Sequence, residues 1–253
     1  MEFLGTPDIG ALAFFGLTLA SLVTCFIGVF TGAAGGIVLL GLMAVMMPPL
    51  ALIPVHTVVM LGSGITRTMI MWRHVMRPAV LPFVIGSLIG AAAGARVFVA
   101  LSTMWLEFIL GAFILLVTWM PKFGRFGAER SRFGALGFVT TFLGVFVSAT
   151  GTLLAPFVAA STPDRRVHVA TMGALMMTSH LAKVGAFGFI GFAIGRYVPL
   201  MVAMIATGAV GNWLGEIALL RTKEQHFRLV LQAALTILGL RLLWSAARSA
   251  GWF

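Results

Sequence analysis

The chain has 253 residues, of which 60% are hydrophobic and 9% charged, with a mean hydropathy of +1.07. This composition excludes an ordinary soluble domain, because a soluble core of this size needs far fewer apolar residues. The net charge of +10 would suit a nucleic-acid partner, but the basic residues lie in short gaps between apolar segments, so no nucleic acid is expected. The single cysteine, Cys25, excludes an internal disulfide and a thiolate metal cluster.

The apolar segments predict the membrane elements. In chain order they are 9–30, 37–53, 54–72, 79–101 and 105–121, then 133–147, 152–161, 168–191, 198–219 and 227–247. A spanning helix needs about 20 apolar residues. Segments 133–147 and 152–161 are shorter than this, and Pro48-Pro49 ends the second arm of the first hairpin early. Each half is therefore predicted to contain a broken, re-entrant-like helical hairpin followed by three transmembrane helices. Whether the hairpin arms cross the membrane completely stays open.

The two halves resemble each other. Residues 27–36 and 143–152 are similar glycine- and hydroxyl-rich interruptions of apolar runs, offset by 116 positions. A hairpin returns to its starting side, so three further crossings invert the second copy. The predicted fold is an all-α polytopic membrane protein with two inverted repeats, residues 1–121 and 133–253, joined by a basic cytoplasmic linker at 122–132.

The distribution of basic residues agrees with this inversion. If the turn at 73–77 is cytoplasmic, the loops on the cytoplasmic side contain eleven of the 17 Lys and Arg residues: Arg73, Arg77, Lys122, Arg125, Arg130, Arg132, Arg165, Arg166, Arg221, Lys223 and Arg228. Cytoplasmic loops are rich in Lys and Arg. We therefore expect a multi-pass protein of a bacterial inner membrane with both termini on the periplasmic side.

The two interruptions predict an anion site. A broken transmembrane helix exposes backbone groups that only protein, water or a ligand can satisfy. If the second arms begin near Gly35 and Gly151, their free N–H groups and positive dipole ends point into a shared cavity. The predicted binding residues at the two breaks are Thr31, Gly32, Gly35, Gly36, Ser148, Thr150, Gly151 and Thr152. Packing of helices through small residues is the alternative explanation.

Charges inside the apolar segments also favour an anion. Arg67 and Lys183 are 116 positions apart, and each follows a serine, Ser63 or Ser179, by four residues. An ionised side chain at membrane depth is costly and therefore indicates a functional site, although either cation could reach an interface instead. His180, near Lys183, is either a packed histidine or a proton-coupling group.

The remaining charged and titratable groups have simpler interpretations. Arg96 and Glu107 are expected to form a structural ion pair. His56, His74, His168 and His226 lie at segment ends without metal-ligand spacing. No metal and no cofactor are predicted.

Several motifs together resemble the TauE/SafE family of sulfite exporters. Residues 86–96 (GSLIGAAAGAR) are similar to the family's Gly-Ser-x-x-Gly-x-x-x-Gly-Ala-Arg signature. Residues 32–36 are similar to the family's glycine-rich hairpin run. Residues 169–174 (VATMGA) resemble the Ala-Thr segment of its second repeat. The resemblance covers essentially the whole chain and implies transport of small sulfur-containing anions such as sulfite, sulfoacetate or another organosulfonate. Two departures leave the substrate open: the second hairpin is hydroxyl-rich, and Gly211-Asn212-Trp213 replaces Gly-Ala-Arg in the second repeat.

The function predicted from sequence is secondary transport of a small anion by alternating access, with no enzymatic activity. Asn212 is predicted to line the path. An anion channel, a membrane enzyme and a structural or assembly factor are the alternatives, and the enzyme lacks a convincing nucleophile–base pair. The expected partners are the anionic substrate and membrane lipid, and a homodimer is possible. Transport direction and proton coupling stay open.

Overall fold

The computed structural model describes residues 3–31, 34–119, 132–191, 194–218 and 227–251, in which the named elements are all helices. The first half contains α1 (Ala11–Thr31), α2 (Ala34–Met46), α3 (Pro49–Met71), α4 (Arg77–Ala100) and α5 (Thr103–Trp119). The second half contains α6 (Arg132–Val147), α7 (Gly151–Ser161), α8 (Arg165–Phe189), α9 (Val198–Ala218) and α10 (Phe227–Ser249). Short 3-10 helices, η1 (Trp72–His74) and η2 (Ile194–Tyr197), precede α4 and α9. The prediction of an all-α fold is confirmed.

One predicted boundary is wrong, and proline explains the difference. We expected segments at 37–53 and 54–72, whereas α2 ends at Met46 and α3 already begins at Pro49. Pro48 is extended, with φ −66° and ψ 145°, and Pro49 occupies the first helical turn, where its missing N–H is not needed. Pro54 lies inside α3 without ending it. His56 is therefore inside a helix, not at the end of one.

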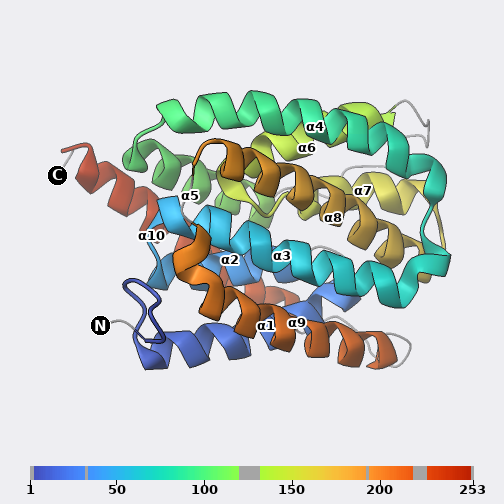
Figure 1. The fold of residues 1–253 in the computed structure, drawn as a ribbon, viewed down its shortest axis with the longest axis horizontal. Coiled ribbons are helices and arrows are strands. Elements are labelled where there is room, and N and C mark those ends of the chain that lie inside the picture. Colours follow the sequence, from blue (N-terminus) through green and yellow to red (C-terminus); the bar gives the residue numbers. More distant parts are fainter. Residues whose placement is uncertain (1–2, 32–33, 120–131, 192–193, 219–226, 252–253) are drawn as a thin grey trace.

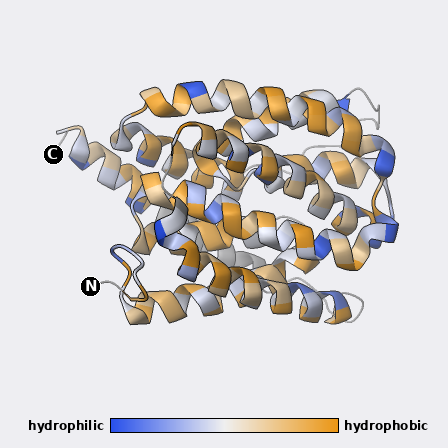
Figure 2. Cartoon of the chain, in the orientation of Figure 1, coloured by the Kyte–Doolittle hydropathy of each residue, from blue (hydrophilic) through white to orange (hydrophobic). Residues whose placement is uncertain are grey.

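The lengths and surfaces of the helices fit a bilayer. Among the described residues, four helical stretches are long and apolar enough to cross it: Ala11–Val29, Leu50–His74, Arg77–Ala100 and Gly195–Ala218. α8 has 25 residues but is less apolar, because it carries buried polar side chains. Large apolar side chains cover the outside of the bundle; Leu12 is 89% exposed and Phe189 94%. Figure 2 shows hydrophobic residues along the flanks of the helices. The chain is a multi-pass membrane protein.

Both ends of the described chain lie at the same end of the bundle, and the turn from α3 to α4 is at the other (Figure 1). This turn carries Arg73 and Arg77, whose guanidinium carbons lie 5.6 and 5.9 Å from the ring centroid of Trp72. Trp72 is half exposed, as expected for an aromatic residue at a membrane interface. Which side of the membrane each end faces stays a prediction.

Glycines set the closest helix contacts. α4 packs along α6, and α9 packs along α1. A Cβ atom added to Gly86 of α4 would meet the carbonyl oxygen of Gly134, and one added to Gly211 of α9 would meet that of Leu22. Small residues let membrane helices approach this closely.

The packing partners exchange between the two halves. An offset of 116 residues pairs α1 with α6, α3 with α8, α4 with α9 and α5 with α10. The contact of α4 with α6 then corresponds to that of α9 with α1, and α3–α8 and α5–α10 each pair equivalent helices. Any twofold relation between the two halves, inverted or parallel, predicts such an exchange.

Candidate anion site

The structure contains the second predicted break. At the first, α1 and α2 fold back on each other, with Gly28 and Gly35 in close approach, and residues 32–33 lie outside the described part of the chain. α1 ends at Thr31 and α2 begins at Ala34; α6 ends at Val147 and α7 begins at Gly151. In the second break, Ser148 adopts the left-handed region with φ +56°, which is uncommon for a residue other than glycine. The N–H of Ser148 still donates to the Gly144 carbonyl at 2.8 Å, so the chain leaves the helix immediately after it.

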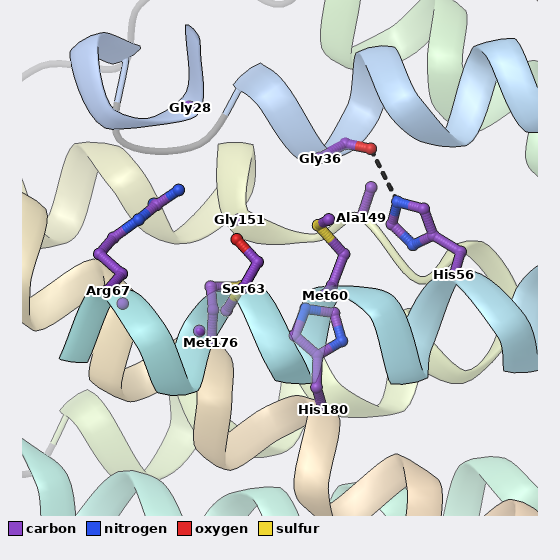
Figure 3. A pocket seen from close by; sticks show the side chains of 12 residues that line it. Gly28, Gly36, His56, Met60, Ser63, Arg67, Ala149, Gly151, Met176 and His180 are labelled. Carbon is purple, nitrogen blue, oxygen red and sulfur yellow. Dashed lines mark hydrogen bonds between the residues drawn. The ribbon is translucent and has the colours of Figure 1, made fainter. Parts of the chain in front are cut away.

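A cavity of about 50 Å³ lies between α3, α8 and the two broken hairpins. One face of α3 provides a row of lining residues, His56, Met60, Ser63, Gly64 and Arg67 (Figure 3). Their spacing places them on the same side of a helix. The hairpins contribute Gly28, Gly36, Ala149 and Gly151, and α8 contributes Gly173, Met176 and His180. Met60 and Met176 are equivalent under the 116-residue offset, as are Gly64 and His180.

Arg67 occupies one end of this row. Its Nη2 donates to Oδ1 of Asn212 on α9 at 3.3 Å. The Asn212 amide in turn donates to Ser63 Oγ at 3.0 Å, which orients the two polar groups together. Glycine provides the space: a Cβ atom on Gly28 would lie 3.0 Å from Arg67 Nη2, and one on Gly173 would lie 3.1 Å from Arg67 Cδ. The guanidinium is thus held between α1, α8 and α9.

Lys183, unlike Arg67, lies outside the cavity lining. It is fully buried and does not line the cavity. Its Nζ donates to the carbonyl oxygen of Ser148 at 3.0 Å, so it holds the second break from behind. A Cβ atom on Gly144 would lie 3.0 Å from Nζ. Each cation therefore packs over the equivalent glycine in the first helix of its own half, Arg67 over Gly28 and Lys183 over Gly144.

His56 is the site residue that sequence reasoning missed. The fully buried imidazole lies 2.9 Å from the Gly36 carbonyl through Nε2 and 2.8 Å from Ser148 Oγ through Nδ1. It connects the first turn of α2 to the second break, and Figure 3 shows the first of these two contacts, with Gly36. The signal that could have found it is the apolar continuity of 49–71, which places His56 inside a helix on the same face as Ser63 and Arg67.

The other predicted residues have varied positions. Thr150 is fully buried, and its Oγ1, like that of Thr152, has no hydrogen-bond partner among the described residues. Ser179 accepts from Thr141 Oγ1 at 2.9 Å and lies outside the cavity lining. His180 lines the cavity and is 3% exposed, and its Nδ1 has no partner in the described structure.

The two adjacent glycines of the first break have different surroundings. Gly35 faces α1, because a Cβ atom there would meet backbone atoms of Thr24 and Gly28. Gly36 lines the cavity, and a Cβ atom added to it would lie 3.4 Å from Met60 Sδ. Gly32 and the side chain of Thr31 lie outside the described part of the chain.

The predicted ion pair of Arg96 with Glu107 is wrong. Arg96 lines an apolar groove between α4 and α8, whereas Glu107 belongs to α5, and its Oε2 has no hydrogen-bond partner within the described residues. Proximity in sequence suggested the pair, but α4 packs mainly against α6 and α8, whereas α5 packs mainly against α10. Nor do His, Cys, Asp and Glu side chains gather into a possible metal site in the described ranges.

The fold and the cavity define a class: a polytopic α-helical membrane protein with two broken hairpins around a buried, positively charged cavity. A family model described as sulfite exporter TauE/SafE matches residues 17–242. The chain belongs to this family of membrane transporters, as its sequence motifs predicted. No curated protein and no solved structure matches it.

Proposed function

We propose that the protein transports sulfite, or a sulfur anion of similar size, across the bacterial inner membrane by alternating access. The observation that carries this proposal is the cavity itself. It lies where both broken hairpins meet, and Arg67, the backbone at Gly36 and Gly151, and the start of α7 all face it. Helix N-termini and exposed backbone N–H groups bind oxyanions, and a guanidinium binds them by charge-assisted hydrogen bonds.

The electrostatics of the site favour a negative ligand. At an effective dielectric constant of about 20, and before desolvation is counted, an anion gains roughly 2 kcal/mol from a cation about 7 Å away and roughly 1.4 kcal/mol from one about 12 Å away. Arg67 acts from the cavity wall and Lys183 from behind the Ser148 carbonyl. The positive dipole ends of α2 and α7 add to this potential.

The size of the cavity favours sulfite over organosulfonates. The cavity, of about 50 Å³, has room for a small anion of a few heavy atoms. Sulfite, one sulfur with three oxygens, fits this volume. Sulfoacetate adds a methylene and a carboxylate and requires a wider cavity.

Two inverted repeats would supply the movement. The exchange of packing partners between the halves supports such a relation, and α3 and α8 cross next to the cavity, where a Cβ atom on Gly64 would lie 3.1 Å from the Met177 backbone. In carriers built this way, one repeat rocks against the other around a central site.

Ligand-dependent stability tests the substrate. We expect sulfite to raise the unfolding temperature of the detergent-purified protein, because a ligand that binds only the native state stabilises it, by about 2.7 kcal/mol at a hundredfold excess over Kd. Sulfoacetate should stabilise less, and zwitterionic taurine not at all. A panel of sulfite, sulfate, sulfoacetate and taurine checks this. Equal shifts with taurine and sulfite would contradict an anion site.

Counterflow separates a carrier from a channel. Proteoliposomes loaded with unlabelled sulfite should accumulate labelled sulfite transiently, because a carrier exposes its site to one side at a time. A channel would equilibrate the label without accumulation. Absence of counterflow together with rapid, non-saturating flux would therefore favour the channel.

Lys183→Met tests whether the second cation acts electrostatically. The substitution removes the donor to Ser148 O but keeps a side chain of similar length in the same buried space. Removing a buried charge relieves its desolvation cost, whereas leaving the Ser148 carbonyl without this donor costs about 1–3 kcal/mol, so the two effects oppose each other. We expect an unfolding temperature close to that of the wild type and a sulfite affinity reduced about tenfold, measured by calorimetry. A large drop in unfolding temperature would instead mean that Lys183 mainly stabilises the break.

A further inference from the structure

His56 joins the two broken hairpins at the cavity. Its Nε2 lies against the Gly36 carbonyl of α2, and its Nδ1 lies against Ser148 Oγ in the second break. The imidazole also lines the cavity, three helical turns from Arg67, or about 16 Å along α3. Any change in its hydrogen bonds therefore acts on both hairpins and on a bound anion.

The hydrogen bonds continue beyond the imidazole. Ser148 Oγ lies 2.8 Å from Thr57 Oγ1, and Thr57 Oγ1 lies 2.8 Å from the Ile53 carbonyl. The chain thus runs from the Gly36 carbonyl through His56, Ser148 and Thr57 to the Ile53 carbonyl. Both ends of this chain are carbonyl oxygens, which only accept hydrogen bonds.

Counting hydrogens distinguishes the two protonation states of His56. The chain has four contacts, and each requires one hydrogen. A neutral imidazole provides one hydrogen, and the two hydroxyls provide one each, so one contact is left without a donor. An imidazolium provides two hydrogens. All contacts are then satisfied, with Nε2–H donating to Gly36 and Nδ1–H donating to Ser148, whose hydroxyl donates to Thr57.

Burial of the imidazole opposes the second proton, and the surrounding charges decide when His56 holds it in spite of that cost. α2 and α7 carry no titratable side chain, α6 carries Arg132 at its first residue, and α5 carries Glu107. α8 brings Lys183 and His180, both of which interact electrostatically with the imidazole. Lys183 repels an imidazolium when the cavity holds no anion. A negative charge in the cavity offsets that repulsion, so anion and proton each favour the binding of the other.

We propose that His56 is the binding site of a proton that travels with the anion, and that its protonation ties the two broken hairpins together around the loaded cavity. The proton enters from the side to which the cavity is open and binds the imidazole without any bond being formed to the anion. It leaves when the hairpins separate on the other side. The inference rests on the proposed function, since it requires an anion in the cavity.

The test is the pH dependence of sulfite binding to the full-length protein. Kd for sulfite is measured by calorimetry between about pH 5.5 and 8, the range in which histidine titrates. Sulfite itself takes up a proton in this range, but that contribution is common to all variants. As pH rises, the sulfite affinity of the wild-type protein should fall. We expect this fall to be steeper than that of His56→Gln by up to tenfold per pH unit, because glutamine cannot bind the proton.

Two further histidines provide the comparison. His168→Gln, in the first turn of α8, is the matched control, and His180→Gln changes the other buried histidine of the cavity. Both should keep the wild-type pH slope. If His180→Gln removes the slope and His56→Gln does not, the proton site is misassigned and the inference is overturned.

A second variant tests the inference if His56→Gln does not fold. Ser148→Ala keeps His56 but removes the acceptor of Nδ1–H, so it should also reduce the pH slope. Equal slopes in wild type, His56→Gln and Ser148→Ala would overturn the proton site while leaving sulfite binding intact. Failure of sulfite to bind wild-type protein would overturn the proposed function, and this inference with it.

Discussion

Arg67→Gln should lower the affinity for sulfite about thirtyfold, the largest loss that we expect from a single side chain of the cavity. The substitution removes a full positive charge from the cavity wall, worth roughly 2 kcal/mol at about 7 Å and an effective dielectric constant of about 20. Glutamine still offers an amide toward Asn212, so the loss reports the charge more than the local hydrogen bond. The sulfite-induced rise in unfolding temperature and the rate of sulfite counterflow should both fall.

Arg96→Gln is the matched control for this experiment. Arg96 is also an arginine within an apolar helix, but it lies in the groove between α4 and α8, away from the cavity. We expect sulfite affinity to stay within twofold of the wild type. Equal losses in the two variants would indicate a general effect of intramembrane charge, and an unchanged affinity in Arg67→Gln would remove the guanidinium from the site.

The helices could be predicted from sequence because the bilayer imposes a simple rule on them. Apolar runs must be helical and of a limited length, so the bounds of α4, α5, α6, α7 and α9 differ from the predicted segments by at most two residues. The break at 148–150 and the reversal between α1 and α2 could be predicted as well, since glycine and hydroxyl residues interrupt otherwise continuous runs. Family membership followed from the same motifs.

The cavity could be predicted only in part, because its lining depends on which helix faces meet. Ser63 and Arg67 share a face of α3, and this was predicted from their spacing. His56 lies on the same face, but the sequence places it at a segment end, because Pro54 resembles a boundary although it is tolerated within α3. Lys183 was expected near the anion or at an interface, and the structure places it behind the Ser148 carbonyl.

Adjacent glycines illustrate the limit most clearly. Gly35 and Gly36 are the same residue type in one motif, and sequence alone assigned both to the anion. In the structure they point in different directions: Gly35 packs against α1, and Gly36 lines the cavity. Their roles differ because successive helical residues are about 100° apart around the helix axis.

Gly35→Ala should destabilise the protein severely. A Cβ atom there would lie 2.8 Å from Gly28 Cα and closer still to the Thr24 carbonyl, both of them backbone atoms that cannot rotate away. α1 and α2 would have to separate, and overpacking of this kind costs about 1–3 kcal/mol or more, against the gain of up to about 1 kcal/mol from replacing a helical glycine. We expect a clearly lower unfolding temperature in detergent and a smaller monodisperse fraction in size-exclusion chromatography.

Gly36→Ala should have the opposite effects, with stability kept and sulfite binding weakened. Its methyl group would meet only Met60 Sδ, at 3.4 Å, and a methionine side chain can move aside, so the unfolding temperature should match or exceed that of the wild type. The same methyl group occupies part of the cavity of about 50 Å³, and sulfite affinity should fall several-fold. Two neighbouring substitutions of identical chemistry would then separate packing from binding. Normal stability and weakened binding in Gly35→Ala would mean that this glycine, too, faces the anion, and that α2 is rotated relative to the arrangement described above.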